Sequence, residues 1–205
     1  KLMVKEAVKL HDSGSAADNY LIGTVYRKAG DLERAMHFLL EAERLEPGDR
    51  ETVLELASLF EDRGEYGKAI ERVRGLHRDD PGDPSLSNFY GYLLAQKGED
   101  LDLAERLLLE ALEKEPDNGY FLDSLGWIKY RQGEYEKALE ILLRAVETVG
   151  DDPVIWEHLG DTYLKLSRFS EAEDAYAKSL GIAPGKPLVQ GKLEKAKKAG
   201  LDEGI

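Results

Sequence analysis

Apolar and small residues recur at helical spacing along the chain, in stripes that come in pairs. Trp156, Leu159 and Tyr163 lie at i, i+3 and i+7, so they share one face of a predicted helix. Ala172 and Tyr176 belong to a second stripe a few residues later. Because both stripes are short and a turn signal lies between them, the pattern predicts two helices joined by a tight turn.

The paired stripes repeat along the chain. A small residue recurs in the first predicted helix of each unit, at steps of 34, 34, 35 and 34 residues: Gly23, Ala57, Gly91, Gly126 and Gly160. Alanines in the second predicted helix recur at steps of 34, 35, 34 and 34 residues: Ala35, Ala69, Ala104, Ala138 and Ala172. Two sets of residues with one period predict five copies of one helical unit. The longer step reflects one extra residue between Gly98 and Ala104.

Turn residues separate the two helices of each unit. Four units place a glycine followed by an acid there: Gly30-Asp31, Gly64-Glu65, Gly98-Glu99 and Gly133-Glu134. Glycine just past a helix end takes the left-handed conformation, and the acid favours the next helix N-terminus. The fifth unit has Ser167-Arg168 instead, where Ser170 and Glu173 predict a capping box.

The combined pattern resembles that of the tetratricopeptide repeat (TPR). W-x2-L-G-x2-Y, then A-x3-F/Y and a closing proline at a 34-residue period, is typical of that family. The resemblance implies an all-α fold, a right-handed α-solenoid of about five helix-turn-helix repeats with a C-terminal capping helix. The stretches 88–92 and 123–127 are similar to those of bacterial TPR proteins. The five predicted repeats span residues 16–49, 50–83, 84–118, 119–152 and 153–186.

The two ends of the chain do not follow the repeat. Within residues 187–205, Val189, Leu193 and Ala196 share an apolar face, whereas the lysines, Lys192 among them, are expected mostly on the solvent side. This predicts a C-terminal capping helix and tail. Residues 1–15 fit an N-terminal cap helix or the remnant of an earlier repeat, and the sequence leaves both open.

Composition and charge narrow the function classes. The chain of 205 residues has 28 basic and 41 acidic residues, a net charge of −13, and no cysteine. An acidic surface repels phosphate, so nucleic acid is not expected as a partner. No apolar run approaches the ~20 residues that span a bilayer, so no membrane span is expected. The compartment stays open between the cytoplasm and a bacterial cell envelope.

The TPR resemblance also implies where a partner binds. In such arrays the first helix of each repeat lines a concave groove, mainly through its second, fifth, ninth, twelfth and thirteenth positions. Large aromatic side chains with a polar atom are enriched at binding hot spots, although they also serve as core residues that pack between repeats. The predicted groove residues are Asn88, Tyr92, Tyr120, Asp123, Trp127, Tyr130, Arg131 and Asp161.

The charges of the groove positions suggest the chemistry of a partner. Carboxylates outnumber cations there, so a protein or peptide with basic and apolar residues would be complementary. The residue pair with which some TPR domains clamp a chaperone's C-terminal carboxylate is absent, since Tyr20 and Thr24 stand in its place. Chaperone-tail binding is therefore disfavoured.

No catalytic, metal or cofactor site is expected. The four histidines are scattered, without the spacing of a metal motif, and no glycine-rich loop suits a phosphate. His158 is expected to have a structural or surface role. The leading hypothesis is an adaptor that holds a peptide or partner protein in the TPR groove. The alternatives are a self-associating scaffold, which would form a homo-oligomer, and the regulatory portion of a larger protein.

Overall fold

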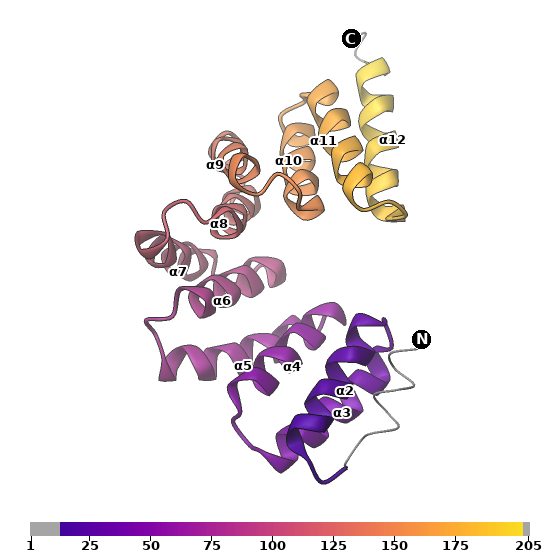
Figure 1. Cartoon of the computed structure of the whole chain (residues 1–205). Helices are drawn as coiled ribbons and strands as arrows, with labels where there is room; N and C mark the ends of the chain where they lie inside the picture. The colour runs from indigo at the N-terminus through magenta and orange to yellow at the C-terminus, as the bar shows by residue number, and fades with distance from the viewer. Residues whose placement is uncertain (1–12, 203–205) are drawn as a thin grey trace. The chain divides into compact units, whose positions relative to one another are not determined.

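The computed structural model describes residues 13–202, and these residues form eleven helices and no strand (Figure 1). The predicted all-α fold is confirmed. The predicted N-terminal cap falls mostly outside the described residues. Ten of these helices form five consecutive pairs. Each of the ten has 13 or 14 residues, and short turns join them. The first helix of each pair is α2 (Ala16–Lys28), α4 (Arg50–Asp62), α6 (Pro84–Lys97), α8 (Gly119–Arg131) and α10 (Pro153–Lys165). The second is α3 (Leu32–Leu45), α5 (Tyr66–Asp79), α7 (Leu101–Lys114), α9 (Tyr135–Thr148) and α11 (Phe169–Ile182), and α12 (Pro187–Asp202) follows.

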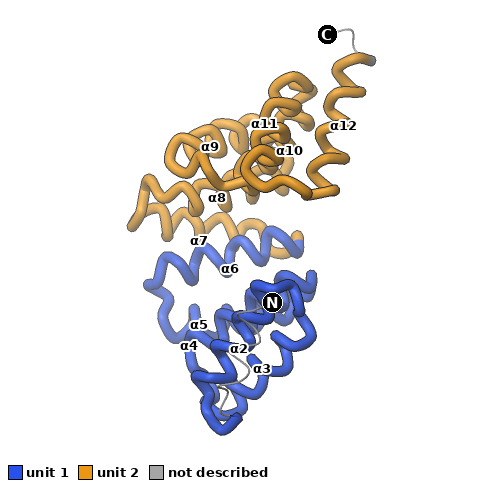
Figure 2. The backbone as a smooth tube through the Cα atoms, turned by 45° about the vertical axis from the view of Figure 1, so that its right-hand side comes forward, with its two compact units in different colours: residues 1–97 blue, residues 98–205 orange. Residues whose placement is uncertain are grey.

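The chain divides into two compact units, residues 1–97 and 98–205 (Figure 2). The third helix pair is shared between them, with α6 in unit 1 and α7 in unit 2. The division falls at the turn that carries the extra residue. There Asp100 has a positive φ of 44° and caps α7 by accepting a hydrogen bond from the Leu103 N–H at 3.3 Å. The inserted residue is thus accommodated by a left-handed backbone conformation rather than by a longer loop.

The turn inside the fifth pair corrects one prediction. Ser170 lies within α11, so it does not cap that helix, and the predicted capping box is wrong. Arg168 is the N-cap residue, and its side chain makes no capping hydrogen bond. Its guanidinium instead pairs with Glu171 at 2.7 Å and lies 4.8 Å from the ring centroid of Tyr163. The cation–π contact and the ion pair hold Arg168 at the surface of α10 and α11.

The core of unit 1 forms where the second helix of one pair packs against both neighbouring first helices. Leu39 of α3 and Leu56 of α4 are fully buried in one cluster with Ile22 and Tyr26 of α2. Gly23 permits the close packing of α2 on α3, because a Cβ at that position would lie 2.6 Å from Leu39 Cγ. The small-residue period in the sequence therefore marks the helix crossings.

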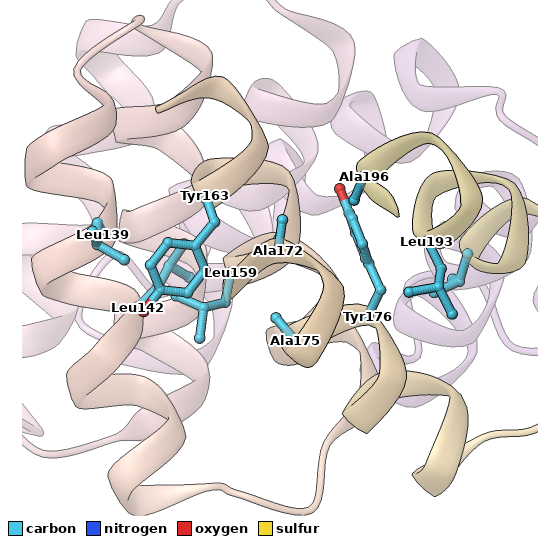
Figure 3. Packing of buried hydrophobic residues seen from close by; sticks show 10 residues of the cluster. Leu139, Leu142, Leu159, Tyr163, Ala172, Ala175, Tyr176, Leu193 and Ala196 are labelled. Carbon is cyan, nitrogen blue, oxygen red and sulfur yellow. The ribbon is translucent and has the colours of Figure 1, made fainter. Parts of the chain in front are cut away.

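Unit 2 has a larger cluster that runs from α9 to α12 (Figure 3). Tyr176 of α11 is fully buried on the side facing Leu193 and Ala196 of α12. Gly160 packs against the Tyr176 ring, since a Cβ there would lie 2.6 Å from Cε1. On α12, Val189, Leu193 and Ala196 are buried, whereas Glu194, Lys195 and Lys198 are exposed. This amphipathic packing is that of the predicted capping helix.

Candidate functional site

The structure distributes the predicted groove residues over both units. Asn88 and Tyr92 lie on α6 of unit 1, and the other six lie in unit 2. In unit 2, Tyr120, Asp123, Trp127, Tyr130 and Arg131 belong to α8, and Asp161 belongs to α10. The six unit-2 residues, together with His158, Glu157 and Lys192, form a surface that is here called the inner face of unit 2.

Three rings stack on the inner face of unit 2. The centroids of Trp127 and Tyr130 are 4.7 Å apart with an interplanar angle of 8°. Trp127 also stacks on His158 of α10, at 4.2 Å and 15°. Trp127 and Tyr130 are half-buried, and Tyr135 contacts the edge of Tyr130 at 5.4 Å. The stack therefore joins α8 to α10 while part of both aromatic side chains stays at the surface.

The indole N–H group of Trp127 and the exposed side chain of Tyr120 differ in their access to the surface. The indole Nε1 of Trp127 is buried and has no hydrogen-bond partner among the described residues. An unsatisfied buried donor costs the folded chain about 1–3 kcal/mol, and this atom has almost no accessible surface. Tyr120, two helical turns before Trp127, is 55% exposed. Residues seven apart in an α-helix are separated by about two turns, roughly 10 Å along the axis. Tyr120 and Trp127 therefore lie on the same face of α8.

Asp123 forms a buried pair with His158. The Asp123 Oδ1 and His158 Nδ1 atoms are 2.9 Å apart, and both residues are buried. Burial alone would lower the pKa of His158, but the nearby carboxylates of Asp123, Asp161 and Glu157 outweigh it and raise the pKa above 6.5. The raised pKa means that the pair favours an imidazolium, stacked on the Trp127 ring.

Asp161 is also engaged inside the unit. It accepts a hydrogen bond from the Tyr176 hydroxyl at 2.7 Å and pairs with Lys192 of α12 at 2.6 Å. Lys192 also pairs with Glu157 at 2.7 Å. Burial disfavours the Lys192 cation, yet its hydrogen bonds to Asp161 and Glu157 raise its pKa overall. The expectation that Lys192 belongs to the solvent side of α12 is therefore wrong.

Sequence reasoning missed two members of this face, His158 and Lys192. Their partners lie 35 and 31 residues away, one repeat apart, so no local pattern reveals the contacts. For Lys192 alone, the repeat period could have indicated the contact. Because α12 begins 34 residues after α10, Lys192 has the register position that His158 has in α10, beside that of Glu157. Arg131, which was predicted, lies against the turn at Gly98, where a Cβ would be 2.7 Å from its Nη2.

The unit-1 residues form a smaller polar group. Tyr92 is half-buried and hydrogen-bonded to Glu61 of α4, and burial followed by the Glu61 charge raises its pKa. The Oδ1 atom of Asn88 is buried without a hydrogen-bond partner among the described residues. Asn88 and Tyr92 are four residues apart and share one face of α6. This group places a half-buried asparagine beside a half-buried tyrosine.

Within residues 13–202 no three His, Cys, Asp or Glu side chains are grouped so that they could hold a metal ion. Over the same residues, none of the helices is both long and apolar enough to cross a bilayer. The chemistry that the described surface offers is therefore that of aromatic, amide and charged side chains.

Comparisons with known proteins agree with the fold. A family model described as tetratricopeptide repeat matches residues 20–84, 54–118, 93–153 and 124–187. A TPR repeat-containing protein of Pseudomonas aeruginosa is 30% identical over 129 residues, 63% of this chain and 22% of the relative. This chain spans about a fifth to a third of the length of the first curated relatives it matches.

Solved structures show the same fold. The thermophilic TPR protein TTC0263 of Thermus thermophilus superposes with a TM-score of 0.77 at 24% identity, over 90% of this chain and all of that one. YrrB, described as a TPR protein with an unusual peptide-binding site, has a TM-score of 0.56 at 18% identity, over 95% and 97% of the two chains. TPR proteins generally mediate protein–protein interactions. With the repeat model matched across most of its length, the chain belongs to the tetratricopeptide-repeat family.

Proposed function

We propose that this chain is a protein-interaction module that holds a segment of a partner protein against the first helices of its repeats. The observation that carries the proposal is the ring stack of Tyr130, Trp127 and His158, in which Trp127 and Tyr130 are only half-buried. Trp and Tyr dominate binding energies because they bury large rigid surfaces and keep a polar group. The exposed Tyr120 on the same helix extends this surface.

The internal ion pairs refine the chemistry of the proposed partner. Asp123, Glu157 and Asp161 are each bonded to a group of their own unit. They are therefore poor anchors for a partner's lysine or arginine, because a new cation would have to displace an existing one. The apolar part of the predicted partner is what this face accommodates best, through the exposed Tyr120 and the half-buried rings of Trp127 and Tyr130.

Asn88 and Tyr92 of α6 provide a second contact region in the proposal. Asn88 and Tyr92 are both half-buried, so an extended segment could contact the exposed part of the amide and of the phenol. YrrB, whose description names a peptide-binding site, supports a peptide ligand for proteins of this fold. The adaptor role thus rests on surface chemistry within each unit separately.

Selection from a random peptide library displayed on phage tests the proposal. Wild type is compared with Tyr120→Ala and with Trp127→Ala/Tyr130→Ala. Tyr120 is 55% exposed, so its truncation leaves folding intact. Leu109→Ala is the matched control, because Leu109 is 46% exposed on α7 and belongs to neither contact region. Circular dichroism verifies equal helicity of all four proteins.

The proposal predicts that peptides selected on wild type bind the Leu109 variant equally well. They should bind Tyr120→Ala about tenfold more weakly, which corresponds to the loss of about 1.4 kcal/mol. Equal binding to wild type and both aromatic variants would refute the assignment of the surface. A mass that rises with concentration, together with no peptide enrichment, would favour the self-associating scaffold.

A further inference from the structure

An open cleft of about 660 Å³ lies on the other side of α10, between α9 and α11. Its lining includes Leu143 of α9, Trp156 and Tyr163 of α10, and Ala175, Asp174 and Lys178 of α11. Trp156, Leu159 and Tyr163 of α10 line this cleft at i, i+3 and i+7, whereas Glu157 and Asp161 of the inner face belong to another stripe of the helix and are not part of the lining. This surface, here called the outer cleft, is separate from the inner face of unit 2.

The aromatic floor of the outer cleft is held in place. The Trp156 indole N–H donates to the Gly150 carbonyl oxygen at 2.8 Å. The Lys178 ammonium lies 4.1 Å from the Trp156 ring centroid. Trp156 is half-buried, and Leu143 beside it is 41% exposed. A fixed indole beside an exposed leucine gives a preformed apolar seat, which reduces the entropy lost on binding.

Three carboxylates lie in or beside the outer cleft. Glu140 and Glu147 flank Leu143 at i−3 and i+4, and therefore share its face of α9. Both are exposed, and Asp174 lies in the cleft lining. Within residues 13–202, the ion pairs of the structure involve none of these three carboxylates. The lysine of the lining, Lys178, is placed over Trp156. Negative charge is thus available around an apolar seat.

We propose that the outer cleft docks a basic amphipathic helix of a partner protein. Leucine or phenylalanine side chains on one face of that helix would contact Leu143 and Trp156. Its flanking lysines or arginines would face Glu140, Glu147 and Asp174. A cleft with helices as both walls and α10 as its floor suits a helix, which presents apolar residues at i, i+3, i+4 and i+7. The proposal is independent of the one for the inner face.

The two tryptophans of the chain allow a direct test, because each reports one surface. Trp127→Phe leaves Trp156 as the only tryptophan, and Trp156→Phe leaves Trp127. The probe is a synthetic Leu/Lys peptide of about 14 residues, roughly four helical turns, with leucines on one face. A peptide of the same composition with scrambled order and a Leu/Glu peptide serve as controls.

The expected result is a saturable change in Trp156 emission with the Leu/Lys peptide, and binding at least about tenfold weaker for both control peptides. Leu143→Asp should lower the affinity by about tenfold or more, and Asp174→Lys should lower it and reduce its salt dependence. Leu109→Asp, at the equivalent exposed position of α7, should leave binding unchanged. Circular dichroism establishes that the variants fold.

Three results would overturn the proposal. These are no change in Trp156 emission, equal losses in the Leu143 and Leu109 variants, or equal binding of the Leu/Glu peptide. A response of Trp127 alone would place the probe on the inner face, which contradicts the outer cleft while leaving the adaptor proposal intact. Failure of the inner-face peptide selection would in turn leave the outer cleft untouched.

Discussion

His158 connects the charge, ring stack and helix packing of unit 2 through one side chain. Its imidazolium would be flanked by Asp123 of α8 and by Glu157 and Asp161 of its own helix, while Lys192 of α12 pairs with the latter two. A proton at this site is bound more tightly in the folded than in the unfolded chain, because the pKa is raised above 6.5. The stabilisation is therefore complete below about pH 6.5.

We expect the free energy of unfolding of unit 2 to fall as the pH rises from about 6.5 through the raised pKa of His158. A single group contributes at most about 1.4 kcal/mol per pH unit. His158→Gln should remove this part of the pH dependence, whereas His77→Gln, in unit 1, should keep it. Urea unfolding followed by tryptophan fluorescence measures the slope. An unchanged slope in His158→Gln would contradict the assignment.

Ser167 is a second residue with a measurable cost. Its φ is 57°, whereas the equivalent turns have glycines with φ of 78°, 70°, 75° and 81° at Gly30, Gly64, Gly98 and Gly133. A left-handed conformation costs a residue with a side chain roughly 1–2 kcal/mol. Glycine avoids this cost but loses more conformational entropy on folding, which offsets part of the gain. Ser167→Gly should therefore stabilise the chain by about 0.5–1 kcal/mol.

The reverse change provides the control for Ser167→Gly. None of the residues that the structure describes lies within 4 Å of a Cβ placed on Gly133, so Gly133→Ser should destabilise through backbone conformation alone. Urea denaturation should show shifts of opposite sign for the two variants. A loss of stability in Ser167→Gly would mean that the serine hydroxyl contributes more than its backbone costs.

At the level of the helices, two glycines in equally regular helices should respond oppositely to the same substitution. Within residues 13–202, nothing lies within 4 Å of a Cβ placed on Gly75 of α5, whereas a Cβ placed on Gly160 of α10 would lie 2.6 Å from the buried ring of Tyr176. Gly75→Ala should stabilise by up to about 1 kcal/mol through helix propensity. Gly160→Ala should destabilise by about 1–3 kcal/mol through overpacking.

Thermal melts by circular dichroism compare these two variants with wild type. If both alanines stabilised the chain, the contact between α10 and α11 would be looser than the Gly160–Tyr176 distance indicates. Glycine in these helices thus has two origins. At Gly160 it is required by a helix crossing, and at Gly75 it is a cost that the packing of unit 1 tolerates.

The helices were predictable because their signals are local and repeated. The small residues at Gly23 and Gly160 mark helix crossings, and the turn glycines mark helix ends. The prediction of a capping box was wrong because the turn before α11 has no glycine to mark the helix start. Without that mark, the sequence does not distinguish Ser170 from an N-cap residue. The positions of the predicted site residues on the first helices followed from the same period.

The connections within the site were not predictable. His158 and Lys192 acquire their roles from contacts across neighbouring repeats, with Asp123 and Asp161. The charges at the groove positions led to the expectation that these carboxylates are available to a basic partner. Side-chain packing instead neutralises them within unit 2, and this information is absent from a one-dimensional pattern.

At the scale of the whole molecule, the distribution of tryptophan makes the two units separately observable. Both tryptophans, Trp127 and Trp156, lie in unit 2, whereas helices of both units contribute to the circular dichroism signal. The units differ in their expected stability. Unit 1 contains α5, which includes Gly67 and Gly75, and unit 2 has the cluster that runs from α9 to the capping helix α12. Local stabilities in repeat proteins add from each repeat and its neighbours, so such differences persist in the intact chain.

We therefore expect urea to reduce helicity before it changes the tryptophan fluorescence, with the circular dichroism midpoint at the lower concentration. Gly75→Ala should bring the two midpoints closer, because it strengthens unit 1 alone. Gly160→Ala should also bring them closer, but by lowering the fluorescence midpoint. Coincident transitions in wild type and in both variants would contradict the expectation, since they would require the whole chain to unfold as one cooperative body despite its division at residue 97.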